Sequence, residues 1–401
     1  MRTTWSFHTA TRLTFGPGAV DQLGEILAAR AIERLVILTD QNLVAAGVAE
    51  RVRASIEAAG VAVETFSDGE AEPSVPCALE AIDCAGRFEP QAVLGLGGGS
   101  NMDLAKITAT VLAHGGSPSD YFGFDRIPGP VLPVISVPTT AGTGSEVSHS
   151  AVLTDTERQL KVSTLSNYLR PSIALVDPEL TDTCPRQVRA DAGIDALVHA
   201  IEAYTAVDYH ALELPPGEKS AYEGRFPLGE CLAEKAIELI GRHLVAAVND
   251  EGHREARDGM ALAATLAGMA FSNCGVALVH ALEYPIGGAL HCSHGAGNGL
   301  LLPYVMRFNL PVRQRAFARI AALLGEDVNG LSEAEAAERA IEAVRRIRRQ
   351  IGIPERLRDI GATPIQIPLF AEKSYGIARL RWVNPRPATN QDLRDILKSA
   401  F

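Results

Sequence analysis

Apolar and polar positions follow different patterns in the two halves of this 401-residue chain. Up to about residue 185, helical stretches alternate with short apolar runs, which are RLVILTD at 34–40, QAVLGLG at 91–97, LPVISVP at 132–138 and SIALVDP at 172–178. Apolar strands that alternate with helices are typical of a parallel sheet covered by helices. After Pro185 the strand-like runs disappear and apolar residues recur with a period near 3.6, which predicts helices.

The two patterns predict two domains. Residues 1–185 are expected to form an α/β domain with a Rossmann-like parallel sheet, and residues 186–401 an all-helical domain. A segment rich in proline, glycine and charge at 210–230 interrupts the helical half and predicts a long surface loop. With 47% apolar and 21% charged residues, the chain is long enough to bury a core in each domain.

Charge and composition exclude several kinds of partner. The net charge of -11 is spread along the chain, which argues against nucleic acid or an anionic membrane. The N-terminal segment lacks the apolar run of a secretory signal, and no apolar stretch reaches the roughly 18 residues of a membrane span. The six cysteines are scattered without a CxxC pair, so a reducing cytoplasm is the expected setting.

A glycine-rich turn follows the second apolar run. In QAVLGLGGGSNMDLAK, the strand leads into Gly97–Gly99 and Ser100, and a helix begins near Asn101. Glycines let the backbone approach a ligand closely, and the free N–H groups at a helix start favour a phosphate. The turn is not the full GxGxxG fingerprint, because Ser100 occupies its sixth position. It predicts a pyrophosphate site, with a tight turn that binds nothing as the alternative.

A second loop, VPTTAGTGSEVS at 137–148, follows the third apolar run. Its five hydroxyl side chains and two glycines suit a phosphate, a ribose or a carboxamide, although a turn stabilised by Ser and Thr has the same composition. Open α/β sheets bind ligands at the carboxyl ends of their strands, where both loops should meet. The two loops together therefore favour a dinucleotide site.

Asp40 ends the first apolar run. A carboxylate at this place can accept both ribose hydroxyls of an adenosine and repel a 2′-phosphate, which favours NAD over NADP. The alternative is a helix N-cap for the following QNLVAAG.

A metal site is predicted in the helical half. Asp195 and His199 are four residues apart in the apolar segment DAGIDALVHAIEAY, so they share one helical face. A buried unpaired carboxylate is costly, and a metal ion is one remedy, while an Asp–His hydrogen bond or ion pair is the alternative. Further along, FSNCGVALVHALEYPIGGALHCSHGAGNG adds His280, His291 and His294. One aspartate with three histidines suits Fe²⁺ or Zn²⁺ and does not decide between them.

Six segments, in order over nearly the whole chain, resemble the iron-containing (group III) alcohol dehydrogenase family: GGGSNMDLAK, PTTAGTGSEVS, GIDALVHAIEAY, AGMAFSNCGVALVHALEYPIGG, HGAGNGLLLPYVMRFN and NPRPATNQDL. The resemblance implies a nucleotide-binding α/β domain and a helical domain in a dehydroquinate synthase-like architecture, with the active site in the cleft between them. It also implies a homodimer or a larger homo-oligomer.

The resemblance assigns roles to individual residues. It places iron, with zinc as the alternative, on Asp195, His199, His280 and His294. It assigns the NAD contacts to Asp40, Gly98, Gly99, Ser100, Thr139, Thr140, Thr143, Lys161 and Leu180. The implied reaction is reversible hydride transfer between a primary alcohol or hydroxy acid and the corresponding aldehyde or semialdehyde.

The sequence departs from the family pattern in two places. Tyr284 stands where many members carry a histidine four residues after the third ligand, and a phenol with a reference pKa of about 10 puts a proton relay here in doubt. Tyr284 is expected either to pack or to donate a hydrogen bond to substrate, and His291 to lie beside the ligands or at the mouth of the site. Tyr284 and the 210–230 insertion also resemble the hydroxyacid–oxoacid transhydrogenase branch, in which a 4-hydroxy acid is oxidised, an oxo acid is reduced and the nicotinamide is recycled.

Two other functions remain open from the sequence. A dehydroquinate-synthase-like lyase has the same architecture and also combines NAD with a metal, but should lack the GIDALVHAIEAY context and carry more basic residues for a phosphate substrate. A non-catalytic nucleotide-binding protein is the third alternative, and it would require no metal.

Overall fold

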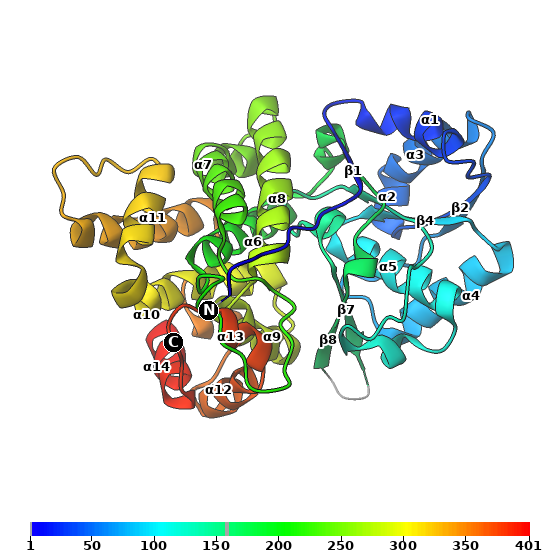
Figure 1. Cartoon of the computed structure of the whole chain (residues 1–401). Coiled ribbons are helices and arrows are strands. Elements are labelled where there is room, and N and C mark those ends of the chain that lie inside the picture. Colours follow the sequence, from blue (N-terminus) through cyan, green and yellow to red (C-terminus); the bar gives the residue numbers. More distant parts are fainter. Residues whose placement is uncertain (1, 157–159) are drawn as a thin grey trace. The chain divides into compact units, whose positions relative to one another are not determined.

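The computed structural model describes residues 2–156 and 160–401. The chain divides into two compact units (Figure 1). One unit contains residues 8–184, and the other joins the segment before His8 to residues 185–401.

A six-stranded parallel sheet forms the centre of the 8–184 unit, in the order β1-β9-β6-β4-β2-β3. The strands are β1 (Arg12–Phe15), β2 (Arg34–Leu38), β3 (Ala62–Phe66), β4 (Ala92–Gly97), β6 (Val134–Pro138) and β9 (Ile173–Val176). The four apolar runs correspond to β2, β4, β6 and β9, which lie next to one another in the middle of the sheet. The predicted parallel sheet is therefore confirmed.

Helices cover both faces of this sheet. They are α1 (Leu23–Ala28), α2 (Gln41–Ala45), α3 (Val48–Glu57), α4 (Val75–Phe88) and α5 (Gly99–His114). Alternate residues of β2 contribute to two separate cores: Leu35 and Ile37 pack with α1 and α3, whereas Val36 and Leu38 pack with α4 and α5. Because the central strands are buried on both faces, their sequences are apolar throughout rather than alternating.

A smaller sheet of β5 (Gly123–Phe124), β7 (Ser150–Asp155) and β8 (Leu160–Leu165) adds to the same unit, in the order β5-β8-β7. β7 and β8 pair antiparallel, and β5 pairs parallel to β8. The sequence patterns do not predict this sheet.

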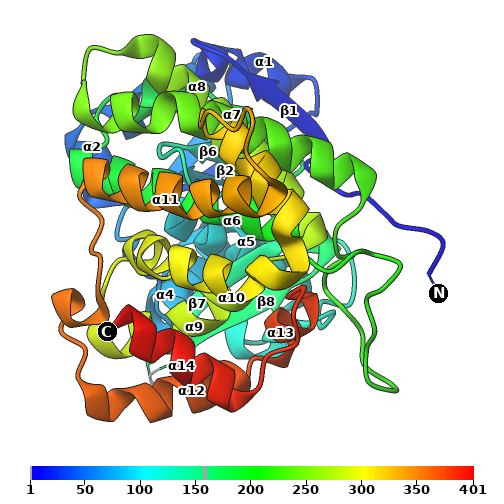
Figure 2. The same ribbon diagram turned by 90° about the vertical axis from the view of Figure 1, so that its left-hand side faces the viewer.

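The other unit is helical, as the sequence predicts (Figure 2). Its helices are α6 (Arg186–Thr205), α7 (Pro227–Asn249), α8 (Arg254–Cys274), α9 (Leu278–Leu290), α10 (His294–Leu323), α11 (Glu333–Ile351), α12 (Ile367–Tyr375), α13 (Ala378–Val383) and α14 (Asn390–Ala400). Short 3₁₀ helices in the two units span Ala19–Gln22, Pro118–Tyr121, Ser145–Val147, Asn167–Leu169, Pro178–Thr181, Leu357–Ile360 and Pro364–Gln366.

The predicted surface loop lies between α6 and α7. It ends earlier than expected, because α7 already begins at Pro227, and proline is favoured in the first turn of a helix. At the base of the loop, Asp208 accepts hydrogen bonds from Arg225 Nε at 2.9 Å and from Arg313 Nη2 at 3.1 Å. Against the effect of burial, these two guanidiniums lower the pKa of Asp208. The base is thus fixed by an ion-pair network, while residues 213–219 are mostly exposed.

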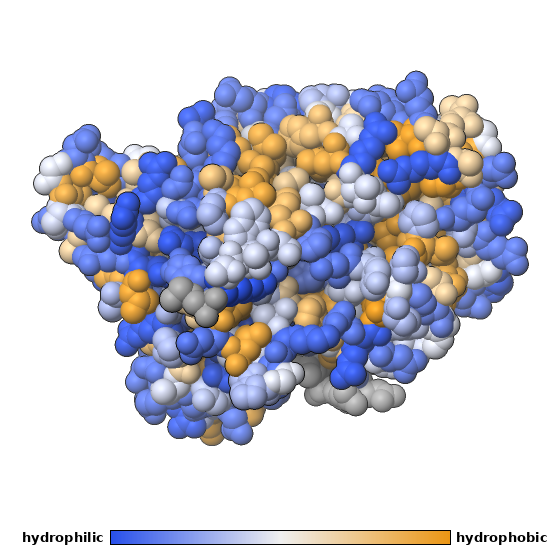
Figure 3. Space-filling view, in the orientation of Figure 1, coloured by the Kyte–Doolittle hydropathy of each residue, from blue (hydrophilic) through white to orange (hydrophobic). Residues whose placement is uncertain are grey.

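Hydrophilic side chains cover much of the face shown in Figure 3, with apolar patches among them. Two of the large exposed apolar side chains, Leu13 and Phe15, lie on the edge strand β1. Among the described residues, no single helix has the length and hydropathy to cross a membrane, and α8 with α9 meets that test only as a pair bent by 103°.

A buried lysine connects α5 to the hydroxyl-rich loop at 137–148. Lys106 is fully buried, and its Nζ donates to Ser145 Oγ at 2.7 Å, to Ser148 Oγ at 3.1 Å and to the carbonyl of Ser150 at 2.8 Å. Asp103 Oδ1 lies 3.6 Å from the same nitrogen. Burial lowers the pKa of Lys106 to about 8 and raises the pKa of Asp103. These contacts hold the loop against the helix that follows the glycine-rich turn.

This pKa shift predicts a pH-dependent stability. Between pH 8 and 10.5, the unfolded chain keeps the Lys106 proton that the folded chain has released, so the free energy of unfolding should rise with pH in that window. Below pH 8 the folded chain also keeps the Lys106 proton, so the free-energy cost of burying this charge is fully present. Lys106→Met removes this titration. The free energy of unfolding of wild type should therefore rise by about 1–3 kcal/mol relative to that of the variant as pH rises through the window. Urea unfolding of both proteins at several pH values measures the difference.

Lys235→Met is the control, because Lys235 is an exposed lysine paired with Glu238. Its difference from wild type should stay constant over the same pH range. A constant difference for Lys106→Met as well would contradict the prediction.

Candidate metal centre and nucleotide site

Asp195 and His199 project from one face of α6, as their spacing predicts. Both are buried, and His199 Nε2 lies 3.7 Å from Asp195 Oδ2. Helix α10 approaches this face closely through two glycines: a Cβ on Gly295 would lie 2.0 Å from the carbonyl oxygen of Asp191, and one on Gly299 would lie 2.6 Å from Ile194. The glycines therefore let the start of α10 reach Asp195.

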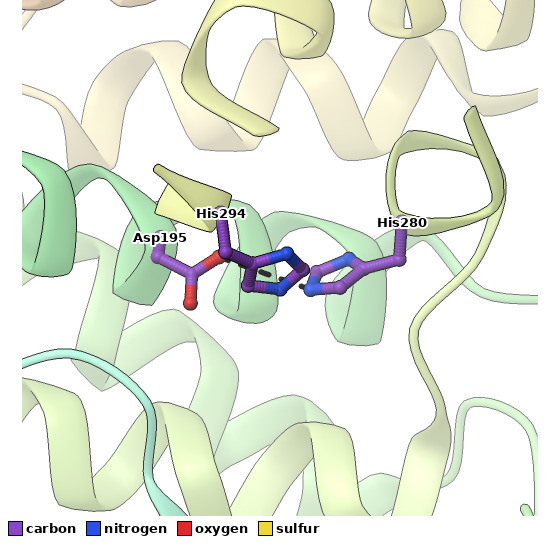
Figure 4. A group of neighbouring side chains, drawn as sticks. All are labelled: Asp195, His280 and His294. Carbon is purple, nitrogen blue, oxygen red and sulfur yellow. Dashed lines mark ion pairs between the residues drawn. The ribbon is translucent and has the colours of Figure 1, made fainter. Parts of the chain in front are cut away.

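Three of the four predicted ligands form one group. Asp195, His280 on α9 and His294 at the start of α10 each offer an atom, and these atoms all lie within 4.8 Å of one another (Figure 4). His280 Nε2 lies 3.8 Å from Asp195 Oδ1. This buried nitrogen has no hydrogen-bond partner among the described residues. Because buried polar atoms are normally paired, its position facing a carboxylate fits a cation between the two side chains.

His199, the fourth predicted ligand, lies beside this group. Its ring stacks on that of His280, with centroids 4.9 Å apart and planes inclined by 17°. The His199 ring also stacks on that of Phe271, at 4.1 Å and 21°. His199 therefore faces the second oxygen of Asp195 rather than the oxygen nearest His280.

The electrostatics of the group favour an ionised Asp195. Burial opposes ionisation, but His199, His294 and His280 together with a hydrogen bond from Asn298 outweigh it and lower the pKa of Asp195. Asn298 Nδ2 donates to Asp195 Oδ1 at 2.8 Å. A buried carboxylate among imidazole nitrogens is a suitable donor set for a divalent cation.

Two glutamates that the sequence reasoning missed hold the histidines. Glu202 Oε2 lies 2.6 Å from His280 Nδ1, and Glu283 Oε2 lies 2.5 Å from His294 Nδ1. Metal-binding histidines commonly donate their second ring N–H to a carboxylate, which leaves Nε2 available to the metal. Each glutamate follows a predicted ligand histidine by three residues but contacts a different histidine, so this spacing gives no signal for the contact.

Tyr284 and His291, which were expected near the substrate and the ligands, differ in position. The Tyr284 ring lies 6.0 Å from that of His294, tilted by 41°, and the guanidinium carbon of Arg379 lies 5.9 Å from the Tyr284 ring centroid. His291 is exposed and ends α9 in a left-handed conformation with φ 52°. The structure thus brings Tyr284 beside the group, but His291 is not a member of it.

The two loops predicted to bind a nucleotide lie against each other in the α/β unit. The backbone N–H of Thr139 donates to the carbonyl of Gly97 at 2.9 Å. A Cβ on Gly98 would lie 3.6 Å from Thr140 Oγ1, and one on Gly99 would lie 2.9 Å from Thr143 Cγ2. Residues without side chains thus sit opposite hydroxyl groups at the start of α5, which fits a phosphate-bearing ligand.

Asp40 is a helix N-cap in this structure. Its Oδ1 accepts from the backbone N–H groups of Asn42 at 2.9 Å and Leu43 at 3.2 Å. Its Oδ2 accepts from Asn101 Nδ2 at 2.8 Å, and Asn101 also donates to the carbonyl of Leu96. Asn101, which was not singled out from the sequence, therefore fixes the Asp40 carboxylate next to the glycine-rich turn.

The remaining predicted nucleotide contacts are engaged elsewhere in the unit. Ser100 Oγ donates to the carbonyl of Ala71, and Lys161 Nζ pairs with Glu72 Oε1 at 2.6 Å, so both contact the segment at 71–72. The side chain of Leu180 is buried in the core. Among these three, Ser100 lies in the glycine-rich turn itself.

Comparisons with known proteins identify the class. The model of the iron-containing alcohol dehydrogenases matches residues 10–178, and that of the C-terminal domain of the Fe-containing alcohol dehydrogenase family matches residues 221–401. The chain is 38% identical over 386 residues to the NAD-dependent methanol dehydrogenase of Bacillus methanolicus, covering 96% of this chain and 97% of that protein. It is 35% identical over 389 residues to the 1,3-propanediol dehydrogenase of Klebsiella pneumoniae, covering 96% of each.

Solved structures agree. The crystal structure of a 1,3-propanediol oxidoreductase superposes with a TM-score of 0.93 at 34% identity and covers 100% of both chains. The fold is thus that of this class of dehydrogenase. The chain belongs to the iron-containing alcohol dehydrogenase family, which confirms the resemblance and favours an oxidoreductase over the lyase.

Proposed function

We propose that the protein is a metal-dependent, NAD-linked oxidoreductase that interconverts an alcohol and its aldehyde. The observation that supports it best is the buried Nε2 of His280, which faces the ionised Asp195 and has no hydrogen-bond partner among the described residues. The relatives add support, since one is an NAD-dependent methanol dehydrogenase and another a 1,3-propanediol dehydrogenase.

In this proposal Asp195, His199, His280 and His294 hold the metal, which is iron or, as the alternative, zinc. When bound, the metal supplies a Lewis acid that lowers the pKa of an alcohol and polarises an aldehyde carbonyl. The chain's own residues prepare this site: Glu202 orients His280, and Asn298 fixes Asp195. The oxidation moves a hydride from the alcohol carbon to the nicotinamide and releases the hydroxyl proton.

We assign NAD binding to the domain expected at 1–185 and metal binding to the domain expected at 186–401. The proposed cofactor contacts are Asp40, Gly98, Gly99, Ser100, Thr139, Thr140, Thr143, Lys161 and Leu180. The contact between the two loops and the Asp40 carboxylate beside them support NAD, because a 2′-phosphate would meet a negative charge there.

Removing a ligand tests the metal and the reaction together. Asp195→Ala and His280→Ala should each lose bound metal and lower kcat/KM for any accepted alcohol by a factor of about 10³ or more, because the alcohol is no longer activated. Elemental analysis and the appearance of NADH measure the two effects. Cys231→Ala, at an exposed position in the same unit, is the control and should retain both.

Full activity in a variant shown to be metal-free would contradict the proposal. Turnover of hydroxy acid and oxo acid without net NADH would indicate the transhydrogenase instead. Consumption of a sugar phosphate without net NADH, and no reaction of alcohols or aldehydes, would indicate the lyase.

A specific observation favours substrates that carry a carboxylate. The guanidinium carbon of Arg379 lies 5.9 Å from the Tyr284 ring centroid, and that centroid lies 6.0 Å from the centroid of His294, so one aromatic ring connects a positive charge to a proposed metal ligand. Arg379 belongs to α13, whose last residue Val383 accepts a hydrogen bond from the backbone N–H of Val207 at 2.8 Å. Val207 in turn accepts a hydrogen bond from the backbone N–H of Arg225 in the inserted loop at 2.7 Å, so the two departures from the family pattern, Tyr284 and this loop, are both linked to α13. We propose a hydroxy acid or semialdehyde as the substrate, recognised through Arg379.

Matched substrates test this specificity. Arg379→Gln should raise KM about 10-fold or more for an alcohol that ends in a carboxylate and leave an uncharged alcohol of equal length within about 3-fold, because one charge-assisted pair is lost. Steady-state kinetics with both substrates measure it.

Arg381→Gln is the matched control on the same helix, since Arg381 stacks on Tyr375 at 3.9 Å and donates to the Tyr375 carbonyl. It should alter neither KM. Two results would contradict the proposal that Arg379 recognises the substrate carboxylate. One is an equal change of KM for both substrates in Arg379→Gln, and the other is a wild-type enzyme that does not prefer the carboxylate-bearing alcohol.

A further inference from the structure

Glutamates and histidines alternate along the proposed metal site. Glu202 follows His199 by three residues on α6, and Glu283 follows His280 by three residues on α9. Each glutamate contacts the next histidine of the series rather than the one before it, so Glu202 meets His280 and Glu283 meets His294. The series therefore links α6, α9 and α10 through their ligands.

The two glutamates differ in their surroundings. Glu202 accepts backbone N–H groups of Ala277 at 2.9 Å and Val279 at 2.7 Å, in addition to its contact with His280, so it also caps the start of α9. Glu283 is fully buried, and its Oε1 has no hydrogen-bond partner among the residues that the structure describes. Such a carboxylate costs free energy unless a nearby positive charge compensates it.

His294 depends on an anchor more than His280 does. It stands at the first position of α10, directly after the connection from α9, and 34% of its side chain is exposed, against 3% for His280. When a carboxylate accepts a hydrogen bond from Nδ1–H of a histidine, the lone pair of Nε2 is available to a cation. The same hydrogen bond fixes the orientation of the imidazole ring.

We propose that Glu283 is a positioning residue that presents His294 to the metal and thereby sets how tightly the metal is held. This inference rests on the proposed metal-binding function. A cation held by His294 would place a positive charge near the buried Glu283 carboxylate, which would offset part of the cost of burying it. This positioning also gives Gly297 a role: a Cβ there would lie 2.9 Å from Glu283 Cγ, so glycine makes room for this side chain.

The test measures metal binding by the metal-free protein, with Co²⁺ as the probe. Competition with a chromophoric chelator gives the affinity, and the visible absorption of bound Co²⁺ reports the ligand geometry. Glu283→Ala should weaken Co²⁺ binding by about 10- to 100-fold and change the absorption bands. Glu283→Gln should lose less Co²⁺ affinity than Glu283→Ala, because the glutamine amide oxygen can still accept a hydrogen bond from His294 Nδ1–H. Glu234→Gln is the matched control, since Glu234 accepts from Tyr204 and Arg319 and should bind Co²⁺ like wild type.

Gly297→Ala perturbs the same contact without removing a polar group, and it should give an intermediate loss of affinity. Circular dichroism of the metal-free variants verifies that they are folded. Wild-type affinity and absorption in folded Glu283→Ala would overturn the positioning role. Failure of wild type itself to bind Co²⁺ would instead overturn the proposed metal function, so the two failures are distinguishable.

Discussion

The helical unit is organised around one buried negative charge, the carboxylate of Asp195. Burial alone would suppress its ionisation, but imidazoles from α6, α9 and α10 surround it and lower its pKa. Bringing three helices to one carboxylate requires close helix contacts, which Gly295 and Gly299 allow. The packing of this unit and the chemistry of the site are therefore consequences of the same constraint.

The sequence predicts the centre of each unit better than its margins. Strands β2, β4, β6 and β9 were predicted because both of their faces are buried, so their sequences are continuously apolar. The edge strands β1 and β3 were missed, because most of their residues are exposed or half-buried and carry no such run. The sheet of β5, β7 and β8 was missed for a similar reason: β7 alternates buried and half-buried residues, and β5 has only two residues.

For the candidate site, sequence spacing identifies residues on one helix but not the contacts between helices. The spacing of Asp195 and His199 predicts a shared helical face, and the structure has it. Glu202 contacts a histidine 78 residues away, and no spacing rule reports that pair. For Asp40, the sequence left a choice between an N-cap and a ribose contact, and the structure shows the N-cap together with a link to Asn101. A carboxylate can serve both roles, because each oxygen has more than one lone pair.

In the proposed function, metal binding and substrate recognition meet at His294. Two consecutive residues of α9 lie against His294 in different ways. Glu283 Oε2 pairs with its Nδ1, whereas the Tyr284 ring lies beside its ring and has the Arg379 guanidinium over it. Because consecutive residues on a helix point about 100° apart, a substitution at one of them leaves the contacts of the other largely in place. Under the proposed function, the affinity for a metal and the choice of substrate can therefore change separately, although both depend on one histidine.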